Sequence, residues 1–237
     1  MQYLRKGEGF VTILRFGHKL SSWPGMSKLA PMNQPSPPSP SVRGPADHDI
    51  RDQIVAAANE HFSQYGYGKT TVSDLAKAIG FSKAYIYKFF DSKQAIGEAI
   101  CSNCLGKIVD AVEQAIEVEG LSSTERLRRL VKALVETGVS LFFNERKLYD
   151  IAAFSAMERW PSSQVYSARI RRFVLDIVRE GRESGEFERK TPLDETVEAI
   201  HLSLRPFTNP LLLQYNLDYV EQAPTLISNL ILRSLMP

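Results

Sequence analysis

From Asp47 to the C-terminus, apolar side chains recur every three or four residues, as they do on one face of an α-helix. No segment shows the period-two alternation of a half-buried strand. The first helical segment ends near Gly66, a residue that stops a helix easily. We therefore predict an all-α protein, whose first helix carries an apolar face of Ile50, Ile54, Ala57, Ala58 and Phe62.

Two short helices joined by a tight turn are predicted between Thr71 and Phe90. Thr71 and Asp74 have the spacing of a capping box, so a second helix begins there and stops at Gly80, which permits the positive φ of a sharp turn. Ser82 caps a third helix, which is expected to continue to Phe90. Two helices that cross steeply through such a turn are typical of a helix-turn-helix, whose second helix enters the major groove of DNA.

The outward face of this third helix carries cationic and hydroxyl groups. Lys83 and Lys88 can neutralise phosphates or donate to guanine, Tyr87 can donate to a phosphate, and Tyr85 can contact a base. Further phosphate contacts are predicted at the starts of the second and fourth helices. The candidate DNA-binding residues are Thr71, Ser73, Lys83, Ala84, Tyr85, Tyr87, Lys88 and Lys93. On spacing alone, the same residues also fit a packed helix pair with core tyrosines and solvated lysines.

Residues 56–96 resemble the DNA-binding domain of the TetR (tetracycline-repressor-like) family. This resemblance implies an all-helical, two-domain subunit that works as a homodimer on palindromic double-stranded DNA. It implies base contacts from Lys83, Ala84, Tyr85 and Lys88, and phosphate contacts from Thr71, Tyr87 and Lys93. Position 85 is usually a small residue in the family, so Tyr85 is a departure. The matching positions are Phe62, Gly66, Tyr67, Thr70, Thr71, Val72, Leu75, Ala76, Gly80, Phe81, Ser82, Ile86, Tyr87, Phe90 and Lys93.

The charge of the chain is uneven along its length. Of 29 Lys and Arg and 27 Asp and Glu, residues 1–45 hold six basic side chains and one acidic one. The rest is therefore net acidic, with 23 basic and 26 acidic side chains. A globally basic nucleic-acid binder is excluded, and any DNA contact must come from a local cluster of basic side chains.

Residues 1–46 differ in composition from the rest. The stretch 31–45 holds six prolines, which favours an extended, disordered linker. A short apolar run at 10–14 has basic flanks, but it is short for a secretory signal and no small-residue cleavage site follows. The predicted organisation is a disordered extension (1–46), a helix-turn-helix domain (47–107) and a helical effector-binding and dimerisation domain (108–237).

The C-terminal region carries no catalytic or metal-binding motif, so neither an enzyme, a cofactor nor a metal is predicted. The resemblance implies a small-molecule effector there, and aromatic side chains serve equally as core and as pocket lining. The residues Gly181–Phe187 resemble the end of a central helix of the family's C-terminal domain. The candidate pocket residues are Phe142, Phe154, Met157, Trp160, Phe173 and His201.

The last two helices, around Ala199 and Ile227, are strongly apolar, and the resemblance implies that they form the dimer interface. Cys101 and Cys104 lie one turn apart on the fourth helix, where a redox or metal switch and a pair of buried, inert thiols are the alternatives. We expect a cytoplasmic transcription regulator, a repressor, with no membrane association. The alternative is a helical protein-interaction module without sequence-specific DNA binding.

Overall fold

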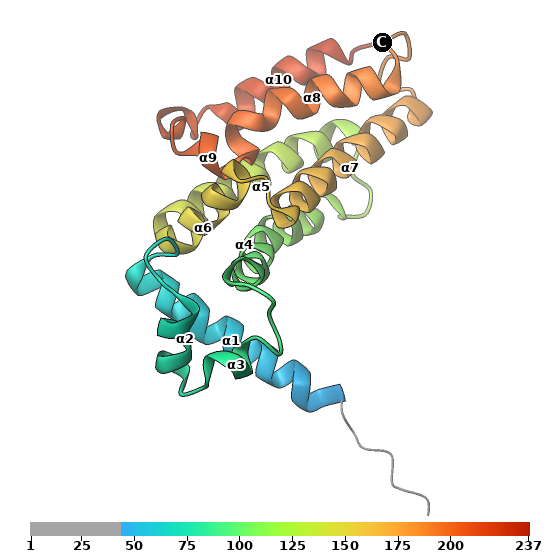
Figure 1. The fold of residues 1–237 in the computed structure, drawn as a ribbon. Coiled ribbons are helices and arrows are strands. Elements are labelled where there is room, and N and C mark those ends of the chain that lie inside the picture. The colour runs from blue at the N-terminus through green and yellow to red at the C-terminus, as the bar shows by residue number, and fades with distance from the viewer. Residues whose placement is uncertain (1–43) are drawn as a thin grey trace, which may run out of the picture. The chain divides into compact units, whose positions relative to one another are not determined.

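The computed structural model describes residues 44–237 (Figure 1). Within them the chain is helical and has no strand, which confirms the predicted all-α fold. The extension predicted for residues 1–46 lies outside the described residues, except for its last three residues, which begin the first helix. The elements are α1 (Gly44–Tyr65), α2 (Val72–Ile79), α3 (Lys83–Ile86), α4 (Lys93–Ile116), α5 (Ser123–Asn144), α6 (Arg146–Met157), α7 (Pro161–Ser184), α8 (Leu193–Thr208), α9 (Pro210–Leu213), a 3₁₀ helix (Leu217–Tyr219) and α10 (Ala223–Ser234).

The head, residues 47–92, packs α1, α2 and α3 around a small apolar core. Its local signals act as predicted: Thr71 and Asp74 form a reciprocal capping box, and Gly80 ends α2 with φ of 77°. The predicted extent of the third helix was wrong, because α3 ends at Ile86 and a turn follows it. The amides of Lys88 and Phe89 in that turn bond to carbonyls three residues back, and Phe90, which follows, is buried in the head core. The core residues are Ile54, Ala58, Phe62, Val72, Leu75, Ala76, Ile86 and Phe90.

The body, residues 93–237, is a layered bundle in which the long helix α4 packs against α5, α6 and α7 (Figure 1). The helix α4 runs without a break through residue 107, so the predicted domain boundary lies inside one helix. The helix α8 packs on α7, and α10 packs on α5 and beside α8. None of the described helices is long and apolar enough to cross a membrane.

The corner between α7 and α8 shows why the segment Gly181–Phe187 has its sequence. Gly185 ends α7 in the left-handed region with φ of 82°, a conformation that glycine adopts without strain. The chain then folds back, and the Phe187 amide donates to the Gly181 carbonyl at 2.9 Å. The buried Phe187 ring lies directly on Gly181, where a side chain would overlap it. A single glycine therefore makes room for the ring that closes this end of the body.

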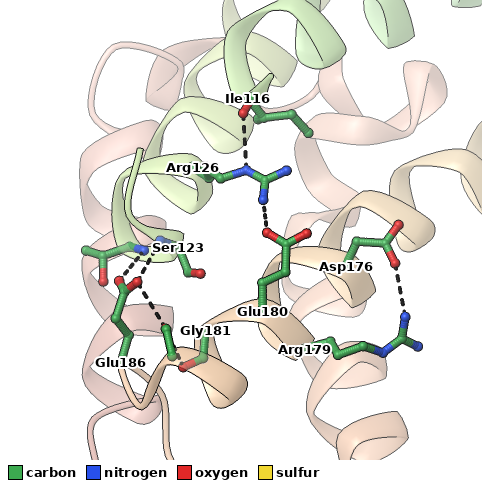
Figure 2. A network of polar contacts seen from close by, with 10 residues as sticks. Ile116, Ser123, Arg126, Asp176, Arg179, Glu180, Gly181 and Glu186 are labelled. Atoms are coloured by element: carbon green, nitrogen blue, oxygen red, sulfur yellow. Dashed lines mark hydrogen bonds and ion pairs between the residues drawn. The ribbon is translucent and has the colours of Figure 1, made fainter. Parts of the chain in front are cut away.

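Glu186, from the same corner, caps a different helix (Figure 2). Its two carboxylate oxygens accept the backbone amides of Ser123 and Thr124 at 3.0 Å, at the start of α5. The Ser122 hydroxyl accepts the Glu125 amide at 3.1 Å, and the Glu125 carboxylate accepts from Arg129 at 3.0 Å. The start of α5 is thus capped by the neighbouring Ser122 and by a carboxylate 63 residues after Ser123 in the sequence.

Replacing Gly181 with alanine is expected to lower the free energy of unfolding by about 1–3 kcal/mol, because the new methyl group would overlap the Phe187 ring in a packed corner. The matched control is Gly106→Ala in α4, where an added Cβ meets no heavy atom within 4 Å. That variant should be neutral or stabilised by up to about 1 kcal/mol. Urea unfolding followed by circular dichroism measures both, and equal values for the two variants would contradict the assigned contact.

Candidate nucleic-acid interface

The recognition segment, residues 82–89, presents a row of exposed side chains on the outside of the head. The Ser82 hydroxyl caps α3 by accepting the Tyr85 amide at 3.1 Å. Lys83, Ala84 and Lys88 are exposed, and Tyr87 is 42% exposed. Each lysine lies near an aromatic ring, with Lys83 Nζ 5.8 Å from the Tyr87 ring centre. The head therefore displays two ammonium groups and a phenol on a short, capped helix whose inner side is buried.

Tyr85 is placed differently from the other candidate residues. Its ring is half-buried and packs edge-on between Phe81, at 5.1 Å, and Phe89, at 5.4 Å. Lys88 Nζ lies 5.5 Å from the same ring. Tyr85 is thus the middle one of three rings that pack edge to face along the recognition segment. This packing restricts the movement of the Tyr85 side chain and of Lys88.

Thr71 and Ser73 begin α2, where phosphate contacts were expected. Both donors of Thr71 already have a partner, because its amide and its hydroxyl donate to the Asp74 carboxylate at 2.9 and 2.6 Å. These two bonds lower the pKa of Asp74, so the carboxylate is charged at neutral pH. Both donors of Thr71 therefore close the helix cap, and its phosphate contact stays a prediction. Ser73 is half-buried in the first turn.

Lys93 also has an internal role that the sequence did not indicate. Its ammonium donates to the carbonyl oxygens of Tyr67 and Thr70, both at 3.0 Å, and lies 4.2 Å from the Tyr67 ring centre. Burial lowers the pKa of the ammonium. Lys93 therefore fastens the loop between α1 and α2 to the start of α4, and its phosphate contact stays a prediction.

Arg51 supports the recognition segment from α1, and sequence reasoning missed it. Its guanidinium donates to the Phe89 carbonyl at 2.6 Å and lies 4.1 Å from the Phe90 ring centre. This contact ties the end of the recognition segment to the first helix. The two partners are 38 residues apart, so no local spacing points to it.

An aromatic junction, Tyr67 with Phe154 and Trp160, joins the head to the body. The Tyr67 ring lies 5.4 Å from both of the other rings, which come from α6 and the turn before α7. Gly97 of α4 leaves the space for it, since a Cβ there would lie 2.8 Å from Tyr67 and 3.0 Å from Trp160. Burial raises the pKa of Tyr67 to about 12, with a smaller contribution from the nearby Glu98.

The six residues predicted to line one pocket do not converge. Phe154 and Trp160 belong to the aromatic junction, while Phe142 packs edge-on against Tyr149. Phe173 is buried under Arg169, and Met157 is largely exposed. Of the six, only His201 lines the cavity described next. Helical periodicity places a side chain on an inward face, but it does not say which neighbouring helix that face meets.

The body cavity is a hollow of about 520 Å³ between the end of α6, the first half of α7, and α8. Its volume lies within the range of small-molecule sites. Glu198, on its wall, is bonded by Arg171 at 3.2 Å. Burial lowers the pKa of His201, whose Nε2 lies 3.2 Å from the Ser167 hydroxyl. The lining residues are Ala156, Arg159, Ser163, Gln164, Tyr166, Ser167, Glu198, His201, Leu202, Arg205, Thr208, Asn209 and Pro210.

Cys101 and Cys104 are both buried in α4, as one of the two predicted alternatives requires. The Cys101 thiol donates to the Ser155 hydroxyl at 3.0 Å. Burial raises the pKa of both thiols, that of Cys104 to about 12, so neither forms a thiolate at neutral pH. The two sulfurs therefore serve as packing groups between α4 and its neighbours.

Two family models match this chain. The model described as "Bacterial regulatory proteins, tetR family" matches residues 54–100, which include the recognition segment. The model described as "Tetracyclin repressor-like, C-terminal domain" matches residues 123–224, which include the body cavity. The first match thus covers most of the head and the start of α4, and the second lies within the body.

Individual transcriptional regulators are also similar to this chain. The HTH-type transcriptional repressor DhaR of Mycobacterium sp. (strain GP1) is 20% identical over 187 residues, covering 78% of this chain and 93% of DhaR. The negative transcriptional regulator IcaR of Staphylococcus epidermidis is 33% identical over 61 residues, only 33% of its length. Among solved structures, the TetR family regulator PfmR of Thermus thermophilus is 26% identical with a TM-score of 0.51, covering 78% of this chain and 99% of PfmR. The fatty acid degradation regulator FadR of Bacillus halodurans shares the fold at 22% identity and a TM-score of 0.58, covering 77% and 94%.

Proposed function

This chain belongs to the TetR family of bacterial transcriptional regulators, and we propose that it represses transcription by binding a palindromic operator as a homodimer until a small molecule releases it. The observation that carries the DNA-binding part is the row of exposed Lys83, Tyr87 and Lys88. They lie on a recognition segment that Arg51 of α1 holds in place. The relatives DhaR and IcaR, a repressor and a negative regulator by name, support the direction of regulation.

Contacts within the head divide its residues into two groups. Lys83, Tyr87 and Lys88 are the proposed DNA contacts, with Ala84 small enough for close approach of the helix to the groove. Tyr85 is proposed to contact a base with its ring edge, from a position held by Phe81 and Phe89. The second group, Thr71, Lys93 and Arg51, is proposed to hold the recognition segment in place.

The proposal of DNA binding is tested with the unmodified protein and a DNA fragment that flanks its own gene. We expect a gel shift that a scrambled fragment of the same length does not give. The logarithm of the binding constant should fall linearly with the logarithm of salt concentration, with a slope of about −0.9 per phosphate contacted. Equal binding to both fragments, or none, would contradict an operator-binding function and favour a protein-interaction module.

The proposed dimer uses the outer faces of α8 and α10. Leu226 and Leu230, one turn apart on α10, are 62% and 68% exposed, and Leu202 on α8 is half exposed. A stripe of leucines on two neighbouring helices is a costly surface in water, and the same surface of a second copy would cover it. A twofold axis there would give two heads for two half-sites of a palindrome.

Replacing Leu226 and Leu230 together with aspartate is expected to convert the protein from a dimer to a 26.7 kDa monomer, because four carboxylates would face each other without partners across the twofold axis. Sedimentation equilibrium measures the mass. Val118→Asp, an exposed apolar residue after α4, is the control and should stay dimeric. A monomeric unmodified protein, or a dimeric double variant, would contradict this interface.

Effector release is proposed to act through the segment between α6 and α7. Arg159 of this segment lines the body cavity, as do Ser163 and Gln164 in the first turn of α7, while Trp160 contacts Tyr67 of the head. A ligand that shifts Arg159 therefore shifts Trp160 as well, since they are adjacent in the chain. Through Tyr67, this displacement reaches the loop that Lys93 fastens to α4, which changes the orientation of the recognition segment.

A further inference from the structure

The body cavity concentrates arginines that have no partner. Among the arginines that the structure describes, all but three guanidinium groups donate to a carboxylate, an amide or a carbonyl oxygen. Those three are Arg159, Arg205 and Arg233, and the first two line the same cavity. An arginine side chain gains most from a planar anion that accepts two of its N–H groups. Two such side chains around one hollow indicate a site for a negative group.

The backbone at Arg159 is held in an uncommon conformation. Its φ of 54° makes it the one residue other than glycine with positive φ in the part of the chain that the structure describes. Such a conformation is unfavourable for a residue with a side chain and is kept only where surrounding contacts enforce it. Here the Gln164 side chain, also on the cavity wall, donates to the Arg159 carbonyl at 2.7 Å. The strained turn thus places a cationic residue at the cavity.

Two buried polar atoms on the cavity wall also have no hydrogen-bond partner among the described residues. Tyr166 is only 6% exposed, yet its hydroxyl is unpaired, as is Nδ1 of His201. Both atoms are buried behind the cavity wall, so a ligand reaches them only where the wall shifts. The acid on the wall, Glu198, is already neutralised by Arg171. The polar groups that remain available are cations and uncharged hydrogen-bonding groups.

We propose that the body cavity binds a small organic anion, with its carboxylate or phosphate held by Arg159 and Arg205 and its apolar part against Ala156 and Pro210. A cavity of about 520 Å³ accommodates such a molecule but not a large macromolecular segment. This inference deepens the proposed function, because it gives the effector of the same site a chemical class.

The first test compares acids with their uncharged amides, using the full-length protein. Hexanoate, octanoate and benzoate are titrated calorimetrically against hexanamide, octanamide and benzamide, with phenyl phosphate and inorganic phosphate as further probes. At least one organic anion should bind at least about tenfold more tightly than its amide, and more tightly than inorganic phosphate. Stronger binding of phenyl phosphate than of benzoate would assign the site to phosphates. Equal binding of acids and amides, equal binding of inorganic phosphate, or no binding by any anion would overturn the proposal.

The second test removes the two arginines. R159Q/R205Q should weaken binding of the organic anion by about 10- to 100-fold, while R233Q, which removes the third unpaired arginine, should leave binding unchanged. Unchanged anion binding by R159Q/R205Q would overturn the proposal. Gel shifts distinguish this inference from the proposed function. An anion that binds through Arg159 and Arg205 without releasing DNA would uphold the site and contradict induction. Release of DNA by an uncharged molecule, to the same extent in R159Q/R205Q as in the unmodified protein, would uphold induction and contradict the anion site.

Discussion

Replacing Lys83 and Lys88 together with alanine is expected to weaken binding to the operator by at least about 100-fold at fixed salt. The proposed dimer would lose four ammonium groups from its two recognition segments, and a lysine contact to a base or phosphate contributes about 1 kcal/mol or more. The salt dependence should become shallower at the same time, since fewer counterions are released on binding. Gel shifts over a range of salt concentrations measure both effects.

The control for this variant is a pair of exposed lysines on the body, Lys147 and Lys190, replaced in the same way. That protein has the same net charge as the Lys83 and Lys88 variant, so a difference between them reports position and not overall charge. All four side chains are exposed, so melting temperatures should change little in either protein. Undiminished binding by the Lys83 and Lys88 variant would remove the recognition segment from the proposed interface.

Replacing Trp160 with alanine is expected to lower the free energy of unfolding by about 3–5 kcal/mol, the usual cost of removing a buried indole. Trp160 is 4% exposed, packs edge-on against Tyr67 and Phe154, and fills the space that Gly97 leaves. The head should lose its attachment along with the stability. Hydrogen exchange of the head amides is therefore expected to accelerate more than exchange in α5.

Two further variants make the Trp160 experiment specific. Trp160→Phe keeps a ring against Tyr67 and should lose less stability than the alanine variant. Met157→Ala, in the same segment but 53% exposed, should stay within about 0.5 kcal/mol of the unmodified protein. If Trp160→Ala were as stable as Met157→Ala, the aromatic junction would have no role in holding the head to the body. The same variants test the coupling between the body cavity and the head. An effector concentration that still saturates the cavity of Trp160→Ala should no longer release that protein from DNA.

The residues that sequence reasoning placed correctly act over one helical turn. Thr71 with Asp74, Ser82 before α3, and Gly80 after α2 depend only on bonds between neighbours, so their spacing determines what they do. The two cysteines lie one turn apart on the inward face of α4, so helical periodicity was enough to predict their burial, although the bond from Cys101 to Ser155 spans 54 residues. Local spacing does not reveal every cap, since the distant Glu186 accepts the first two amides of α5.

For Lys93, the family pattern and the contacts in the structure point to different roles. Its position in the chain matches the family pattern, and a lysine in the first turn of a helix is a reasonable phosphate contact. The structure gives its ammonium two carbonyl oxygens from a loop 23 and 26 residues earlier. Thr71 is similar, since its donors are used within the helix cap. Both residues are therefore proposed to position the recognition segment.

The sequence by itself determined the all-α fold, the order of the main helices and the family, because helical periodicity, caps and turn glycines are local properties. Tertiary structure decided which side chains meet across helices. It moved Trp160 and Phe154 from a predicted pocket to the junction with the head, and it brought Arg159 and Arg205, 46 positions apart in the sequence, to one cavity. Periodicity gives the face of a helix that is buried, but the partner of that face depends on how the helices pack, and this packing is a property of the whole chain.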